Sequence, residues 1–244
     1  MRTLLKLSWI ELKLFIREPI TVVFTFALPL IFLFVLGGVF GNIVDRFRNA
    51  EPMDYYTPAY IGLVTASIGL VGLPIHYAKY REGGVLRRFR ASPLPLWCIF
   101  GSQILVSLII ASVGGILLVV SSVIAFDIAV PKSSILVIAG FFPSVIAFVA
   151  IGTFLGALLP TTRAAQGLGL ILFVVMMMLS GTGPPPEYMS DTMERAGHAM
   201  PLYYAIRLIQ DPWLGFGWNW DAFMVLAGVT LAASLASLRL FRWE

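Results

Sequence analysis

Six long stretches of this sequence contain no Asp, Glu, Lys or Arg, and they restrict the fold more than any other feature. They are residues 19–44, 55–78, 91–126, 133–162, 164–186 and 222–238. A helix needs about 20 mostly apolar residues to cross about 30 Å of hydrocarbon. The third stretch is too short for two crossings joined by a turn, so it predicts one helix with extended ends. The sequence therefore predicts six transmembrane helices.

Composition supports this interpretation. Of the 244 residues, 59% are hydrophobic and 12% are charged, whereas soluble domains carry about 25% charged residues. Such a chain cannot bury its apolar residues in one water-soluble core, which excludes an ordinary soluble enzyme and a disordered protein. Its single cysteine excludes a disulfide scaffold. We expect an all-α, polytopic membrane protein in which residues 1–244 form a single transmembrane domain.

The loops between the predicted spans form two sets of unequal charge. The set that contains both termini holds 12 basic and 4 acidic residues, and the other set holds 5 basic and 9 acidic residues. The first set is residues 1–18, 79–90, 163 and 239–244, and the second is residues 45–54, 127–132 and 187–221. Cytoplasmic loops carry the excess of Lys and Arg. Both termini are therefore expected in the cytoplasm, in agreement with an even number of spans.

Residues 3–17 have the pattern of a helix that lies on the membrane surface. Four basic residues share one helical face and four apolar residues share an adjoining face: Arg2, Lys6, Lys13 and Arg17, and Leu5, Trp9, Leu12 and Ile16. A basic stripe beside an apolar stripe with a Trp suits the cytoplasmic membrane surface. The alternative is a charged flank that only sets the topology.

Motifs that carry chemistry are missing from the sequence. A P-loop needs Gly immediately before its Lys, and the four lysines follow Leu, Leu, Ala and Pro. The interiors of the predicted spans hold no Asp, Glu, Lys or Arg, the groups that ion-coupled carriers place there. His76 and His198 are expected on opposite sides of the membrane. The chain is therefore expected to have no catalytic site, metal or cofactor of its own, and uphill transport would need energy from another subunit.

The densest polar segment is the loop of residues 79–93, which carries five basic residues and one acid. Gly83–Gly84 is expected to end the incoming helix, and Ser92–Pro93 to end about two further helical turns. A short helix that exposes Leu86 and Phe89 beside an arginine cluster suits docking to a partner. The alternative is an anchor that contacts lipid head groups, and the two roles are compatible.

Residues 184–221 are expected outside the cell and contain signals for two short helices. Asp191 and Glu194 fit the capping box of one helix, and Pro201 fits the first position of another. The second helix has an apolar face made of Leu202, Ile206 and Ile209, and it is followed by Trp213, Trp218 and Trp220, a residue type enriched at membrane interfaces. This predicts interfacial or re-entrant helices before the last span, with a plain surface loop as the alternative.

Three segments of the chain resemble, in order, those of one family. The string REGGVLRRFRASPLPLW at residues 81–97 resembles the cytoplasmic loop of membrane subunits of ATP-binding-cassette transporters of the type-2 export family. FIREP at 15–19, followed by Pro29 and GGVFG at 37–41, resembles the opening of that family, and MPLYY at 200–204 resembles its segment before the last span. The likeness covers essentially the whole chain and is greatest to bacterial drug-resistance permeases of the daunorubicin-exporter kind.

The resemblance implies a half-transporter that performs no bond chemistry. Two copies of the chain, or the chain and a similar permease, would pair in the inner membrane of a prokaryote. Separate cytoplasmic ATPase subunits, which hold ATP and Mg²⁺, would dock beneath them. Residues 3–17 would form a connecting helix and the 79–93 loop a coupling helix. The coupling role carries over to Arg81, Glu82, Gly83, Gly84, Leu86, Arg87, Arg88 and Arg90. As an alternative, Glu82 pairs with a basic residue within the permease.

In the family, spans two and five line a central cavity. The candidate pathway residues are therefore Thr65, Ile68, Phe173, Met177 and Ser180, with ordinary helix packing or lipid contact as the alternative for each. An apolar or amphipathic cargo, a drug or a lipid, is expected because nothing charged marks the spans. The alternatives are export of a polysaccharide or lipid-linked glycan, a membrane scaffold or sensor, and a passive channel or scramblase. Membrane lipids are expected partners and nucleic acid is not; the sequence does not name the substrate.

Overall fold

The computed structural model describes residues 2–40, 48, 50–86, 88, 96–129, 131–185 and 188–240. These residues form helices and no strands. Six helices are long and apolar enough to cross a membrane: Pro19–Val39, Pro52–Glu82, Cys98–Phe126, Ser134–Leu158, Thr162–Leu179 and Trp220–Leu240. The predicted all-α fold with six spans is confirmed, and the long third run forms one helix as predicted.

Two spans are assembled from consecutive helical pieces. Span one consists of α2 (Pro19–Val22), the π-helical turn η1 (Val23–Ala27) and α3 (Leu28–Phe40), and span two consists of α4 (Pro52–Ser67), the π-helical turn η2 (Ile68–Gly72) and α5 (Leu73–Glu82). Each π-helical turn ends two residues before a proline, Pro29 or Pro74. Proline cannot donate to the preceding turn, and a local π adjustment lets the membrane helix continue past it.

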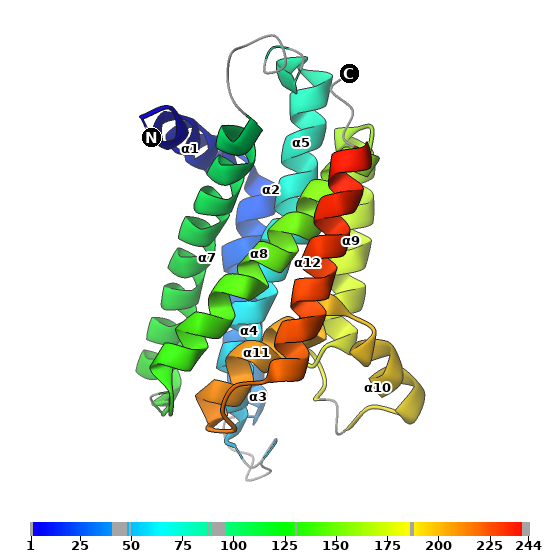
Figure 1. Cartoon of the computed structure of the whole chain (residues 1–244). Coiled ribbons are helices and arrows are strands. Elements are labelled where there is room, and N and C mark those ends of the chain that lie inside the picture. The colour runs from blue at the N-terminus through cyan, green and yellow to red at the C-terminus, as the bar shows by residue number, and fades with distance from the viewer. Residues whose placement is uncertain are drawn as a thin grey trace.

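The remaining helices complete a bundle with two distinct ends. Spans three to six are α7 (Leu96–Phe126), α8 (Ser134–Leu158), α9 (Thr162–Leu179) and α12 (Trp220–Leu240), and the shorter helices are α1 (Arg2–Ile16), α10 (Asp191–His198) and α11 (Pro201–Leu214). The end that holds α1, the last turn of α5 and the last turn of α12 is called the loop end (top of Figure 1). The opposite end, with α10 and α11, is called the α11 end.

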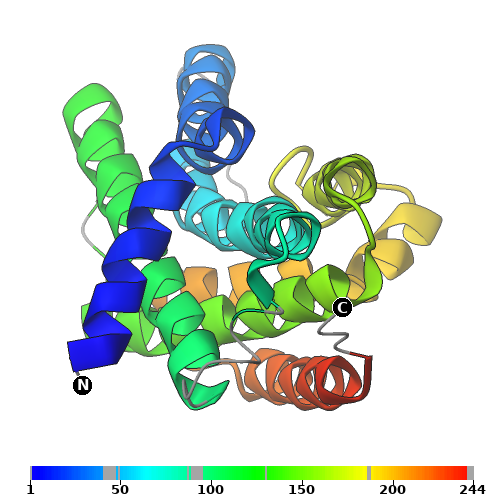
Figure 2. The same ribbon diagram turned by 90° about the horizontal axis from the view of Figure 1, so that it is seen from above.

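Span two runs through the middle of the bundle (Figure 2). Its most apolar 18-residue stretch is completely buried. At η2 the contact with neighbouring helices is backbone to backbone. A Cβ atom on Gly152 of α8 would lie 2.4 Å from the carbonyl oxygen of Gly69, and one on Gly169 of α9 would lie 2.3 Å from that of Leu70. Only glycine permits these approaches, which suit weak Cα–H···O bonds.

At the loop end, α1 lies across the axis of the bundle and packs on α7 (Figures 1 and 2). Its protein-facing side contains Leu7, Ser8 and Glu11, all buried. Leu5, Trp9 and Ile16, from the predicted apolar face, are exposed. That face is therefore free to contact lipid, whereas the face that holds the helix on the protein includes a carboxylate.

At the α11 end, α11 also lies across the bundle axis, packed on α4, α8 and α12 (Figure 1). Pro201 begins the helix as predicted, and its predicted apolar face is buried. The capping-box prediction is wrong by one residue, because Ser190 holds the N-cap position of α10 and makes no side-chain cap bond. Trp213 is buried in the protein core, and its place at a membrane interface stays a prediction. The large indole is covered by the helices that α11 contacts.

Candidate functional site

The 79–93 loop begins where the sequence places it. The Gly83 amide donates to the Lys79 carbonyl at 2.9 Å, and Gly83–Gly84 form the turn that ends α5. Val85, Leu86 and Arg88 are helical again, so helical structure resumes directly after the glycines, where the predicted short helix begins. Four predicted features of the loop lie outside the described residues: Arg87, Phe89, Arg90 and the Ser92–Pro93 stop.

Arg81, in the last turn of α5, holds the C-terminal end of α8. Its guanidinium donates from Nη1 to the Leu159 carbonyl at 2.5 Å and from Nη2 to those of Gly156 at 3.0 Å and Ala157 at 3.4 Å. The last carbonyls of a helix lack amide donors within it, and Pro160, four residues after Gly156, has no N–H to give. A cation also suits the negative end of the helix dipole.

Glu82, the next residue, holds the N-terminal end of α9. One carboxylate oxygen accepts from the Thr162 amide at 2.9 Å, and the other accepts from the Thr162 hydroxyl at 2.7 Å. Its partner is thus a helix N-terminus, where a carboxylate is favoured, and not the basic residue suggested as an alternative. Two adjacent residues of opposite charge therefore bind two different helix ends: the cation binds the C-terminal end of α8, and the anion binds the N-terminal end of α9. We call Arg81 and Glu82 the helix-end clip.

Leu86 and Arg88, both described and both beyond the glycines, differ in exposure. Leu86 is only 1% exposed, so the expectation that it lies on the open surface of the loop is wrong. Burial of a Leu-sized side chain stabilises by about 1.5–3 kcal/mol, so the loop is anchored on its own protein. Arg88 is exposed, and within the described part of the chain its side chain forms no ion pair.

Polar contacts also tie α5 to the N-terminal segment. The buried Glu11 carboxylate of α1 lies 2.5 Å from His76 Nε2 and accepts from the Tyr80 hydroxyl at 2.9 Å. Lys79 forms an ion pair with Glu18, which directly precedes α2. Sequence reasoning missed this link. Its only signal was an acid at position 11 with the helical spacing of Leu7 and Ser8, on a face assigned to neither stripe of α1.

The structure places all five candidate pathway residues inside the single chain. Thr65, Ile68, Phe173, Met177 and Ser180 are each at most 6% exposed. The Thr65 hydroxyl donates to the Gly62 carbonyl at 2.7 Å, and the Phe173 ring meets the Phe24 ring edge-on at 5.5 Å between centroids. All five side chains are covered within the single chain, so they can reach a substrate only if the helices around them rearrange.

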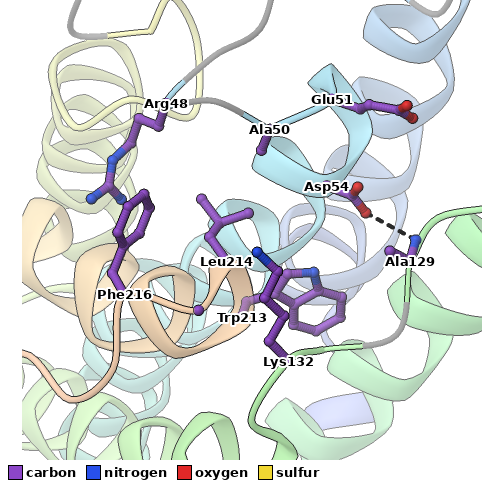
Figure 3. Close-up of a pocket in the computed structure, with 10 residues that line it drawn as sticks. Arg48, Ala50, Glu51, Asp54, Ala129, Lys132, Trp213, Leu214 and Phe216 are labelled. Carbon is purple, nitrogen blue, oxygen red and sulfur yellow. Dashed lines mark hydrogen bonds between the residues drawn. The ribbon is translucent and has the colours of Figure 1, made fainter.

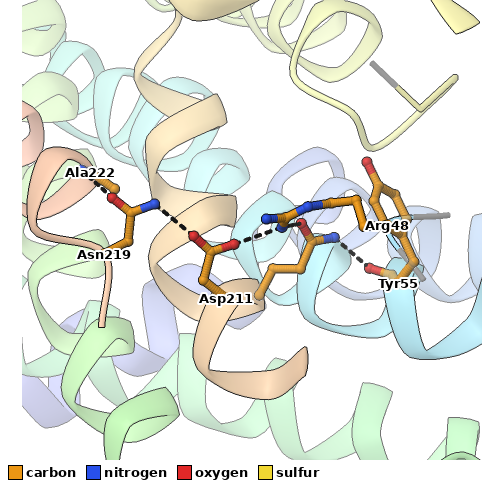
Figure 4. Close-up of polar contacts among 6 residues, drawn as sticks. Arg48, Tyr55, Asp211, Asn219 and Ala222 are labelled. Carbon is orange, nitrogen blue, oxygen red and sulfur yellow. Dashed lines mark hydrogen bonds and ion pairs between the residues drawn. The ribbon is translucent and has the colours of Figure 1, made fainter. Parts of the chain in front are cut away.

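A second polar network crosses the α11 end (Figure 4). Arg48 Nη1 lies 2.6 Å from the Asp211 carboxylate, whose other oxygen accepts from Asn219 at 2.6 Å, and Asn219 in turn accepts from the Ala222 amide at 2.8 Å. Gln210 donates to the Tyr55 carbonyl at 2.9 Å. The network joins the starts of α4 and α12 to α11. Sequence reasoning could not find it, because Arg48 and Asp211 are 163 positions apart.

Six apolar spans, of which the second is buried among the other five and carries polar contacts at its two ends, define the class of membrane permeases. The chain belongs to the ABC-2 type transporter family, whose profile matches residues 2–213. It is also similar to YvfS of Bacillus subtilis (strain 168), which is named by inference as a transport permease. The two sequences are 24% identical over 209 residues, which cover 84% of this chain and 82% of YvfS. The chain is therefore a non-catalytic, multi-pass membrane subunit of a transporter, of a family whose permeases pair with ATP-binding-cassette ATPase subunits.

Proposed function

We propose that this chain is one half of an ATP-driven exporter in the inner membrane of a prokaryote. Two copies pair, and separate ATPase subunits that bind ATP and Mg²⁺ dock at the loop end, which faces the cytoplasm. The excess of basic residues in the loops at that end supports this orientation. Family membership supports the ATPase partner.

The observation that carries the proposal is the helix-end clip. The clip residues directly precede the Gly83–Gly84 turn, and they hydrogen-bond the end of α8 and the start of α9. A push on the 79–93 loop therefore acts at once on spans two, four and five. The contact of Glu11 with His76 and Tyr80 adds α1 to the same unit.

The proposed coupling residues divide into two roles. Leu86 is buried and fixes the short helix to the permease, while Gly83 and Gly84 provide its turn. Arg88 is exposed and is the described residue best placed to meet the ATPase. Arg87 and Arg90 are proposed to act with Arg88 on sequence grounds.

The proposed cargo is an apolar or amphipathic molecule, such as a drug or a lipid. The spans present apolar surface without charged residues in their interiors, which suits such a cargo better than a multiply charged one. The pathway is proposed to open along Thr65 and Ile68 of span two and Phe173, Met177 and Ser180 of span five. In the closed chain the aromatic contact between Phe24 and Phe173 covers it.

Association with the ATPase tests this proposal. Arg88→Glu places a like charge opposite acidic groups expected on the partner, and such juxtaposition is strongly unfavourable. We expect the amount of ATPase that co-purifies with Arg88→Glu from membranes to fall at least about fivefold below that with wild type. Arg195→Glu makes the same charge change at an exposed position of α10, at the α11 end, and serves as the control. Equal retention by wild type and Arg88→Glu would contradict docking through this loop.

A further inference from the structure

A pocket of about 410 Å³ opens at the α11 end, where three connections of the chain meet (Figure 3). The first wall is the start of α4 with the residues just before it, the second is the loop between α7 and α8, and the third is the end of α11. The proposed coupling function uses none of these residues. The pocket is large enough for a small-molecule head group.

The walls of the pocket are bonded to one another. The Asp54 carboxylate of the first wall accepts from the Ala129 amide of the second at 3.0 Å (Figure 3). The Lys132 amide of the second wall donates to the Trp213 carbonyl of the third at 3.2 Å. Arg48 and Asp211 join the first wall to the third, with Arg48 Nη1 2.6 Å from the Asp211 carboxylate. The pocket is therefore preformed, which lowers the entropic cost of binding a ligand.

Charged residues of both signs line the pocket, and not all of them are paired within the described part of the chain. Arg48 is paired with Asp211 and also lies 4.7 Å above the Phe216 ring. By contrast, the Lys132 ammonium and the Glu51 carboxylate form no ion pair or side-chain hydrogen bond within the described part of the chain. Asp54 uses one carboxylate oxygen on Ala129. The pocket thus offers one cation to an anionic group, and two carboxylates to a cationic group.

The position of Lys132 depends on a glycine. Gly215 has a φ of +91°, and a Cβ atom at this position would lie 2.5 Å from Lys132 Cδ. The Lys132 stem therefore lies over the Gly215 backbone, and its ammonium points into the pocket beside Leu214 (Figure 3). Trp213 and Phe216 line the pocket. Phe216 is 56% exposed, and Trp220, the first residue of α12, is 64% exposed. Exposed aromatic rings at the mouth of a membrane bundle are typical of the head-group level.

We propose that this pocket binds the head group of a zwitterionic amphiphile, with its phosphate on Lys132 and its ammonium on Glu51 and Asp54. Trp213 and Leu214 would contact the first apolar carbons that follow the head group. The same chemistry occurs in a phospholipid of the surrounding leaflet and in an exported amphiphile. The proposal does not depend on coupling to an ATPase.

The test uses the purified full chain in detergent, titrated with short-chain phosphatidylethanolamine and, separately, short-chain phosphatidylglycerol, with bound lipid counted by native mass spectrometry. We expect phosphatidylethanolamine to bind about fivefold more tightly. Lys132→Gln should weaken both lipids about threefold to tenfold, whereas Glu51→Gln should weaken only phosphatidylethanolamine. Arg195→Gln, at an exposed site outside the pocket lining, should change neither.

Competition with soluble phosphoethanolamine separates the two sources. Displacement at millimolar concentration supports recognition of the head group alone, as required for an exported cargo, and displacement only by lipids with acyl chains supports a site for a membrane lipid. Gly215→Ala provides a second variant, because it moves the Lys132 stem without removing a charge, and it should lower affinity for both lipids. Equal binding of both lipids by wild type, Lys132→Gln and Glu51→Gln would overturn the proposal.

Discussion

At the scale of single residues, Arg81 takes the place of amide donors that the end of α8 lacks. Its three bonds to Gly156, Ala157 and Leu159 are charge-assisted and partly shielded from water. Hydrogen bonds to charged groups contribute about 1.5–3 kcal/mol when buried, and partial exposure reduces this contribution. Arg81 therefore has a structural role within the chain. Composition alone would assign an arginine in this loop to membrane topology or to partner docking.

We therefore expect Arg81→Gln to lower stability by about 2 kcal/mol. For a chain of this size that corresponds to a fall of about 4–8 °C in the Tm, which thermal unfolding in detergent can measure. Arg88→Gln is the control, because Arg88 is exposed and lies in the same loop, and its Tm should stay within about 2 °C of wild type. A Tm for Arg81→Gln equal to that of Arg88→Gln would show that the clip does not hold α8.

Among the helices, the contact between η2 and α9 determines how closely span five approaches span two. Gly169 faces the Leu70 carbonyl, whereas Gly167, two residues earlier in α9, has nothing within 4 Å of a Cβ position. Both glycines lie within the same helix. Comparing alanine substitutions at these two positions therefore separates the effect of backbone packing on stability from the effect of helix propensity.

Gly169→Ala should be destabilising by about 1–3 kcal/mol, because a methyl group would overpack against a backbone carbonyl that cannot rotate away. Gly167→Ala should be neutral or stabilise by up to about 1 kcal/mol, since alanine favours a helix over glycine. Thermal unfolding of the two variants, side by side, measures the difference. If both changes have the same effect, α9 does not touch η2.

The helices themselves were largely predictable from sequence, and their packing was not. Each span needs about 20 apolar residues, so charge-free runs locate it, and Gly83–Gly84 marks a break by its backbone chemistry. Span two, however, is buried on all sides. Its sequence has no polar face to show which side meets α8, α9 or a pathway. Leu86 was misjudged for a related reason, because exposure depends on neighbours that local spacing does not reveal.

Charged side chains were the least predictable part of the site. A loop rich in Arg and Glu has the same composition whether those groups bind an ATPase, a lipid head group or the ends of nearby helices. Arg81 and Glu82 contact α8 and α9 more than 70 positions further along the chain, and Arg48 contacts Asp211 across most of it. Such contacts follow from the fold, and a single sequence contains no period that indicates them.

For the whole molecule, the proposed orientation places the loop end inside the cell and the α11 end outside. Arg88 and Arg195 are exposed at these two ends, and the natural Cys98 is buried. In a Cys98→Ser background, an impermeant maleimide should label Arg195→Cys in intact cells and should label Arg88→Cys only after the membrane is opened. The reverse pattern would show that the chain is inserted the other way round.

The central claim is that the helix-end clip passes ATPase motion to the spans. The direct measurement is the amount of an amphipathic dye exported per ATP hydrolysed, in proteoliposomes that hold the chain with its ATPase at matched levels. The double variant Arg81→Gln, Glu82→Gln should keep ATP hydrolysis but lose about tenfold in this ratio, within the range typical of coupling between sites. Arg195→Gln should match wild type. An unchanged ratio in the double variant would contradict the account.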